Sequence, residues 1–100
     1  MGWATGHIAR LQAGETITIQ VFGSSMTGRV ANKATVEITP LVGDPARGDV
    51  VLCKVGGSQY LHLVSAVKGE RFQISNNHGH VNGTVGRDRI YGRMTRVVSG

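Results

Sequence analysis

The chain has 100 residues, of which 40% are hydrophobic, and it carries a formal net charge of +5. This length suits a single domain, residues 1–100, with one modest core, and no apolar run approaches the roughly 20 residues of a membrane-spanning helix. The N-terminus lacks the charged and apolar blocks of a signal peptide, and the single cysteine, Cys53, lies in an apolar run, as a reduced core residue would. We therefore expect a cytoplasmic protein without membrane contact.

The first predicted element is a short helix over residues 4–12. Thr5 would cap this helix, because its hydroxyl can accept a hydrogen bond from a free amide of the first turn. Ile8 and Leu11 would share the buried face, and Gly14 would end the helix. Everything after this point is typical of β structure.

Alternating or apolar segments predict strands over residues 15–22, 34–40, 49–55, 59–67, 71–75 and 90–98. Gly56 and Gly57 separate two of these strands and indicate a hairpin turn. The Asn- and Gly-rich segment 76–89 is predicted to be a loop. The fold class is therefore all-β, with a helical arm over 1–13 and a β core over 14–98.

The turn between the first two predicted strands, "GSSMTGRV" at residues 23–30, places small hydroxylated residues where the β pattern stops. A nucleophilic serine needs an exposed hydroxyl, a base within hydrogen-bond reach and nearby main-chain N–H groups that hold an oxyanion. A Gly-Ser-Ser turn can supply the first and third of these. Ser25 is the candidate nucleophile, with Gly23, Ser24 and Met26 as the turn and oxyanion residues, and an ordinary surface turn is the alternative.

His62 is the candidate base. Alternation along its predicted strand places Tyr60, His62 and Val64 on one face. Partial burial among apolar side chains would keep the imidazole neutral near pH 7, as a general base requires. The alternative is a half-buried packing histidine.

Together, these segments resemble the superfamily of LexA-type self-cleaving repressors and type I signal peptidases. The matching features are a Gly-x-Ser-Met turn, a Gly-Asp before an apolar strand, a base-bearing strand, an Asn-rich segment and a closing strand with glycine, here at residues 23–26, 48–52, 59–67, 74–83 and 90–98. The resemblance implies a partly closed barrel of twisted antiparallel sheets. It also implies an endopeptidase that uses Ser25 and, 37 residues later, His62.

This chain departs from the family pattern at two positions. Most members use Lys as the base, whereas His62 stands here, as in the branch similar to the signal peptidases of the endoplasmic reticulum. Gly28 replaces the usual Pro two residues after the methionine. The resemblance further suggests Asp88 as the group that orients the imidazole, with an ion-paired surface carboxylate as the alternative, whereas Asp49 is expected to shape its own turn.

Repressors of this family cut themselves at an Ala-Gly bond upstream of the serine. This chain has Ala13-Gly14, only 11 residues before Ser25. Gly14 serves equally well as a helix stop, so self-cleavage stays open.

The positive charge gathers in the second half of the chain, where seven basic and two acidic side chains lie. The densest part of this charge is formed by Arg87, Arg89, Arg93 and Arg96. It could bind an acidic protein or nucleic acid, with a solvated basic face as the alternative.

The closely spaced pair His78 and His80 could share a metal, but no Cys or carboxylate close in sequence completes the ligand set. No metal or cofactor is predicted.

Three functions stay open at this point. The first is a serine peptidase that cuts a peptide or protein substrate, which requires Ser25 and His62 to approach within roughly 3 Å. The second is a catalytically inactive domain of the same fold that serves as a regulatory or protein-interaction module. The third is a basic module that binds nucleic acid. The oligomeric state is open as well, a homodimer included.

Overall fold

A computed structural model of the chain describes residues 2–99 and consists mainly of strands, with 49% strand and 11% helix. The elements are α1 (Thr5–Gln12), β1 (Ile17–Gln20), β2 (Thr35–Pro40), β3 (Val50–Val55), β4 (Ser58–Lys68), β5 (Arg71–Ser75), β6 (Val81–Gly86), the 3₁₀ turn η1 (Arg87–Arg89) and β7 (Ile90–Ser99). The predicted class, all-β with one short N-terminal helix, is confirmed.

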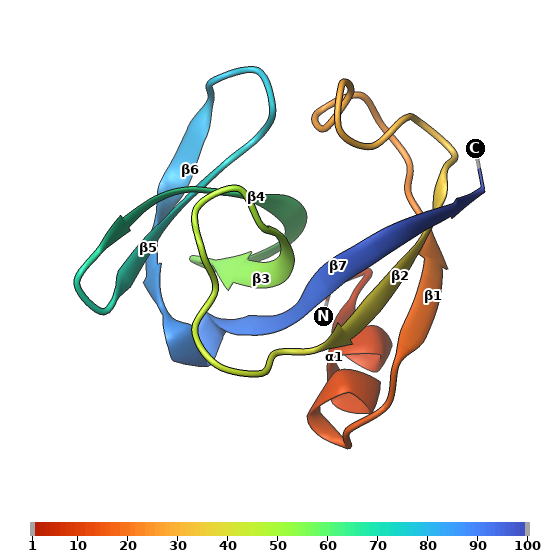
Figure 1. Ribbon diagram of the computed structural model, residues 1–100, viewed down its shortest axis with the longest axis horizontal. Helices are drawn as coiled ribbons and strands as arrows, with labels where there is room; N and C mark the ends of the chain where they lie inside the picture. The colour runs from red at the N-terminus through yellow and green to blue at the C-terminus, as the bar shows by residue number, and fades with distance from the viewer. Residues whose placement is uncertain (1, 100) are drawn as a thin grey trace.

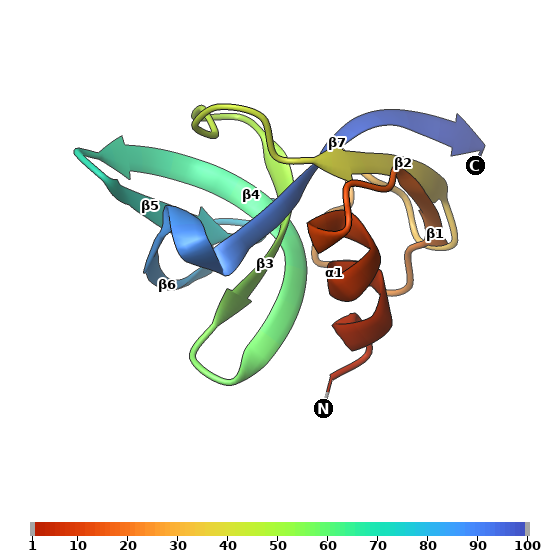
Figure 2. The same cartoon turned by 90° about the horizontal axis from the view of Figure 1, so that it is seen from below.

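The seven strands form one antiparallel sheet in the order β1-β2-β7-β3-β4-β5-β6, which curls into a half-barrel (Figure 1). β7 is central because it pairs with β2 on one side and with β3 on the other. β1 and β6 are the two edges. Figure 2 shows α1 beside β1, β2 and β7, on the side away from β5 and β6. Within residues 2–99, the structure contains no helix with the length and apolar composition needed to cross a membrane.

The core consists of two clusters on opposite faces of β3 and β4. Val50 and Leu52 belong to the cluster that includes α1, β1 and β2, whereas Val51 and Cys53 belong to the cluster that includes β5 and β6. This division follows from the period of two in a strand. It also explains why residues 50–53 of β3 are all apolar, since both faces of the strand are covered there. Burial raises the pKa of the Cys53 thiol to about 12.

The helix forms as predicted, with Ile8 and Leu11 buried, but its cap is different. The N-cap residue is Ala4, and Thr5 is already the first helical residue. The Ala4 main-chain N–H donates to Gln59 Oε1 at 2.7 Å, and Gln59 Nε2 donates to Thr5 Oγ1 at 3.0 Å. A side chain of β4 therefore satisfies the start of the helix.

The predicted loop over residues 76–89 is wrong in part, because it contains β6. Five of its residues pair with β5, and the pairing extends from Arg71↔Gly86 to Ser75↔Val81. Glycine normally weakens a strand, but it suits a strand that another chain segment approaches closely. A Cβ on Gly83 would lie 2.9 Å from Val55 Cγ1 of β3, so the glycine lets β6 pack against that strand.

A glycine is also required in the closing strand β7. A Cβ on Gly92 would lie 2.7 Å from the Thr39 carbonyl oxygen, 2.8 Å from Ile38 Cγ2 and 2.9 Å from Leu11 Cδ1. We therefore expect Gly92→Ala to lower the free energy of unfolding by about 1–3 kcal/mol, as overpacking does. Urea denaturation measures this loss.

The control for this prediction is Gly6→Ala in α1, where a Cβ has nothing within 4 Å. Alanine is the better helix former, so this variant should gain up to about 1 kcal/mol. Equal stabilities of the two variants would contradict the close approach at Gly92.

Candidate active site

The candidate nucleophile lies in the segment between β1 and β2, in a turn over residues 23–28 that we call the serine turn. Two glycines bound this turn with positive φ angles, Gly23 at 103° and Gly28 at 97°. Met26 is only 2% exposed and anchors the turn in the core, whereas Ser25 is exposed. The sequence therefore folds here with its apolar residue inward and its serine outward.

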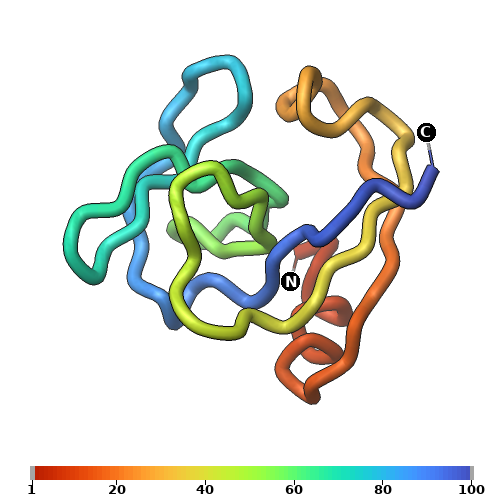
Figure 3. Tube along the Cα trace, in the orientation of Figure 1, coloured from red at the N-terminus to blue at the C-terminus, as the bar shows by residue number. Residues whose placement is uncertain are grey.

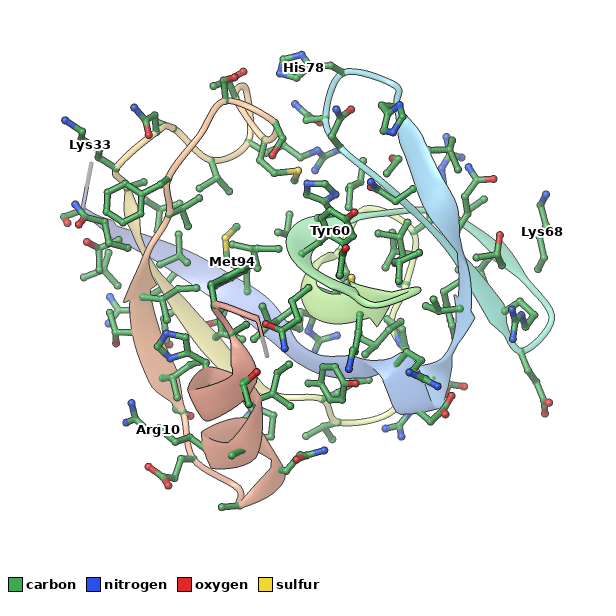
Figure 4. All side chains as sticks on the ribbon, turned by 180° about the vertical axis from the view of Figure 1, so that it is seen from behind. Arg10, Lys33, Tyr60, Lys68, His78 and Met94 are labelled. Atoms are coloured by element: carbon green, nitrogen blue, oxygen red, sulfur yellow. The ribbon has the colours of Figure 1, made fainter. Side chains whose placement is uncertain are left out.

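The loop between β5 and β6 holds the serine turn from the other side. The main-chain N–H of Asn77 donates to the Ser25 carbonyl oxygen at 2.8 Å, and Asn77 Nδ2 donates to the Thr27 carbonyl oxygen at 2.9 Å. Figure 3 shows the two loops facing each other at the top of the molecule, and Figure 4 shows His78 between them. Its Nε2 lies 2.9 Å from the Ser24 carbonyl oxygen. These contacts fix the position of the serine main chain.

His62 reaches the serine from the middle of β4. Its Nε2 lies 3.2 Å from Ser25 Oγ, and its side chain is only 7% exposed. Tyr60, which Figure 4 labels near the centre of the molecule, stacks on the imidazole with ring centroids 4.7 Å apart. The alternation of β4 therefore places Tyr60 and His62 side by side, as predicted from the sequence, and the two candidate residues come within hydrogen-bond distance.

Asn82 of β6 contacts the other nitrogen of the His62 ring, with Oδ1 2.7 Å from Nδ1. It lies at a bulge, because Ile74 pairs with Gly83 and Ser75 with Val81, which leaves Asn82 as the extra residue. Bulges redirect side chains in this way. An amide oxygen only accepts, so Nδ1 carries the hydrogen and Nε2 presents its lone pair to the serine hydroxyl.

The environment of His62 keeps its ring neutral. Burial lowers its pKa below the usual value, the hydrogen bond to Asn82 acts in the opposite direction, and the charge of His80 adds to the lowering. The Ser25 hydroxyl, the Tyr60 ring and Asn82 surround the imidazole, so no carboxylate is among the groups that contact it in residues 2–99. His62 is therefore a weak but available base at neutral pH.

A groove of about 380 Å³ opens beside the Ser25–His62 pair. One wall consists of residues 19–22 and the other of residues 59–61, with Trp3 at the N-terminal side. The lining is mainly apolar, and Trp3 and Phe22 are exposed by 56% and 71%. Such a groove can receive apolar side chains next to the serine hydroxyl.

Four main-chain N–H groups of the serine turn donate no hydrogen bond to any of residues 2–99, those of Ser24, Ser25, Met26 and Gly28. The N–H of Gly23, by contrast, donates to Asn32 Oδ1 at 2.9 Å. Of the predicted turn residues, Ser24 and Met26 can therefore each supply an oxyanion donor together with Ser25, whereas the N–H of Gly23 is already used within the turn.

Asp88 does not occupy the place that the sequence suggested for it. It belongs to η1, is exposed and pairs with Arg89 at 3.8 Å, while Asn82 takes the position at His62 Nδ1. Asp49 does shape its turn, because its Oδ2 accepts a hydrogen bond from the Ala46 main-chain N–H at 2.8 Å. Sequence analysis missed Asn82 because β6 was assigned to a loop, and the spacing of residues does not reveal a bulge.

The four C-terminal arginines do not form an unpaired basic patch. Each lies within 4 Å of a carboxylate, in the pairs Arg87–Asp44 at 3.2 Å, Arg89–Asp88 at 3.8 Å, Arg93–Asp49 at 3.5 Å and Arg96–Glu37 at 3.4 Å. Hydrogen bonds from Thr95 and Arg96 lower the pKa of Glu37, so this carboxylate stays charged. The pairing reduces the positive field that a phosphate backbone would meet.

The two remaining sequence features have structural roles. His78 Nε2 faces the Ser24 carbonyl oxygen and Thr27 Oγ1, so that nitrogen carries a hydrogen and is not a free metal ligand. Among residues 2–99, no group of three potential ligands gathers for a metal. Ala13 and Gly14 follow α1, at the opposite end of β1 from the serine turn (Figure 1), so cleavage there within one molecule would need a large rearrangement.

Gly28, which replaces the family's proline, suits this turn. Its φ of 97° is far from the angle near −65° that proline requires, and a Cβ there would lie 2.8 Å from Asn77 Nδ2. We expect Gly28→Ala to lower the free energy of unfolding by about 1–3 kcal/mol, through backbone strain and displacement of Asn77. Urea denaturation checks this value.

The matched control is Gly14→Ala, because Gly14 has a similar φ of 89° and nothing within 4 Å of the added Cβ. Gly28→Ala should lower the free energy of unfolding by more than Gly14→Ala does. In the background of Asn77→Ala, the two glycine variants should lower it by similar amounts. Equal losses in both glycine variants would contradict the contact with Asn77.

Comparison with protein-family models, with curated proteins and with solved structures finds no match for this chain.

Proposed function

We propose that this chain is a serine hydrolase of the peptidase class, with Ser25 as the nucleophile and His62 as the general base. The observation that carries the proposal is the 3.2 Å distance between Ser25 Oγ and His62 Nε2. The other nitrogen of the same imidazole ring, Nδ1, lies 2.7 Å from Asn82 Oδ1, which holds the ring in position. A serine next to a neutral, oriented imidazole is the arrangement that nucleophilic catalysis requires. The resemblance to LexA-type repressors and signal peptidases favours peptide substrates.

The chemistry follows from the positions of these groups. Ser25 Oγ attacks a peptide carbonyl carbon while His62 Nε2 takes the hydroxyl proton, and the carbonyl oxygen becomes an oxyanion held by the free N–H groups of Ser25 and Met26. His62 then gives its proton to the leaving amine as the C–N bond breaks. A water molecule, deprotonated by the same nitrogen, releases the acyl group and restores the serine.

The substrate would lie in the groove next to the serine. β1 is an edge strand, so the side of it that does not face β2 can pair with an extended peptide. The apolar lining from Trp3 to Leu61 favours apolar substrate side chains beside the scissile bond. These features support a protein or peptide substrate that binds in an extended conformation.

The test is covalent labelling with a fluorophosphonate probe, read by intact mass and peptide mapping. The folded protein should take up one adduct, mapped to Ser25, and Ser25→Ala should take up none. Ser24→Ala is the matched control, since it removes the adjacent hydroxyl and should still be labelled. An adduct on Ser24, or labelling of the unfolded chain alone, would overturn the proposal.

An inactive domain of the same fold is the second candidate. The observation that favours it is the neutral Asn82, which gives the imidazolium no negative charge to stabilise it. A folded protein that takes up no probe would shift the assignment to this protein-interaction role. Nucleic-acid binding through the C-terminal arginines has less support, because all four are paired with carboxylates.

A further inference from the structure

Ion pairing leaves six basic side chains of residues 2–99 without a carboxylate within 4 Å, namely Arg29, Lys33, Arg47, Lys54, Lys68 and Arg71. Arg10 and the four C-terminal arginines all pair with carboxylates. Two of these six come from different strands but lie close together, Lys54 from β3 and Arg71 from β5. Both line the same cavity, which is a separate feature from the groove at Ser25.

This cavity has a volume of about 340 Å³ and a predominantly polar lining. It lies where the β3–β4 hairpin, β5, β6 and η1 meet, and of these elements β5, β6 and η1 lie on the opposite side of the molecule from α1 (Figure 2). Its lining residues are Lys54, Gly56, Arg71, Thr84, Val85, Gly86, Asp88 and Arg89. Three of these carry a positive charge and one carries a negative charge, so the cavity has a local excess of two positive charges.

The cationic groups are partly held in place. Arg71 Nη2 donates to the Thr84 carbonyl oxygen at 3.0 Å, which fixes one side of the guanidinium group. Asp88 pairs with Arg89 at 3.8 Å, the longest of the ion pairs, and both side chains are exposed. A pair of this kind is weak in water, so Arg89 can turn toward an anion in the cavity.

We propose that this cavity binds a phosphate monoester. A monoester carries close to two negative charges at neutral pH and so matches the local excess of charge. Arg71 and Arg89 offer planar N–H donors that suit phosphate oxygens, and Lys54 adds a point charge. The cavity is larger than a phosphate group alone, which leaves room for an attached sugar. The binding is independent of Ser25 and His62.

The test is a titration of the ¹⁵N-labelled full chain with ribose 5-phosphate at low ionic strength, followed by NMR. Amide signals of residues 54–56, 71 and 84–89 should shift and saturate, while those of Ser25 and His62 should not. Lys54→Gln and Arg71→Gln should each weaken binding by about 10-fold or more, the value of one charge-assisted hydrogen bond. Arg47→Gln is the control, because Arg47 is exposed and does not line the cavity.

Four results would overturn the proposal. The first is a titration that does not saturate, and the second is an equal affinity of Lys54→Gln and Arg47→Gln. The third is binding of ribose alone with an affinity similar to that of ribose 5-phosphate, which would show that the phosphate is not recognised. The fourth is tighter binding of a single-stranded oligonucleotide without a terminal phosphate than of ribose 5-phosphate. If Lys54→Gln abolishes that tighter binding, the cavity would instead be assigned to a nucleic-acid backbone. Preserved spectra of the variants show that they remain folded.

Discussion

His62→Ala is expected to slow the phosphonylation of Ser25 by a fluorophosphonate probe by about 10²- to 10⁴-fold at pH 8, the usual contribution of a general base. The ring nitrogen that faces Ser25 Oγ at 3.2 Å is the group that accepts the hydroxyl proton. Without it, the proton must go to water. The rate of adduct formation, measured by intact mass over time, gives this factor.

The pH dependence of labelling provides an independent check. Only neutral His62 accepts a proton, so the rate should rise with pH through the pKa of His62 and then level off. Because burial lowers this pKa below its usual value near 6.5, the rise should be centred below pH 6.5 and most of it should be complete at pH 7. His80→Ala is the control and should leave the plateau unchanged, since His80 influences His62 only through its charge. A rate in His62→Ala equal to that of the unaltered protein would exclude His62 as the base.

Asn82→Asp should have the opposite effect and increase the plateau rate by about 10-fold or more. The new carboxylate would lie at the position of Oδ1, 2.7 Å from His62 Nδ1. It stabilises the imidazolium ion that forms when Nε2 takes the serine proton. The same charge raises the pKa of His62. The pH at which the labelling rate rises should therefore increase by roughly 1 unit.

Two further variants separate this effect from a general change of charge. Val81→Asp places a carboxylate on an exposed neighbour in β6 and should change neither the rate nor the pH profile. Asn82→Leu removes the acceptor at Nδ1 and frees the ring to rotate, so the plateau should fall by about 10-fold or more. If Asn82→Asp leaves the pH profile in place, Asn82 does not orient the imidazole.

Local patterns of the sequence predicted most of the fold. The alternation in residues 15–22 and 34–40 corresponds to β1 and β2, and the glycines at 56 and 57 form the turn between β3 and β4. These predictions rest on interactions between residues close in sequence. The strand β6 was missed because its two glycines and its asparagine disfavour strands, and pairing with β5 outweighs that preference.

The candidate site was predictable to the same extent. The Gly-Ser-Ser turn and the histidine in an apolar strand pointed to Ser25 and His62, and the structure places their side chains 3.2 Å apart. The third residue was not predictable, because a bulge in the β5–β6 pairing directs Asn82 toward the ring. The role of the pair in catalysis stays a prediction until the labelling experiment is done.

The sequence by itself therefore determined six of the seven strands and the exposed serine turn, since these depend on periodicity and on turn-forming residues. The tertiary structure decided which charges meet. Arg93 pairs with Asp49, and Arg96 pairs with Glu37, because β7 lies between β2 and β3 in the sheet. A basic cluster in sequence thus becomes a set of ion pairs, while Lys54 and Arg71 come together from separate strands. Strand order and register depend on contacts between distant residues, which a local pattern does not contain.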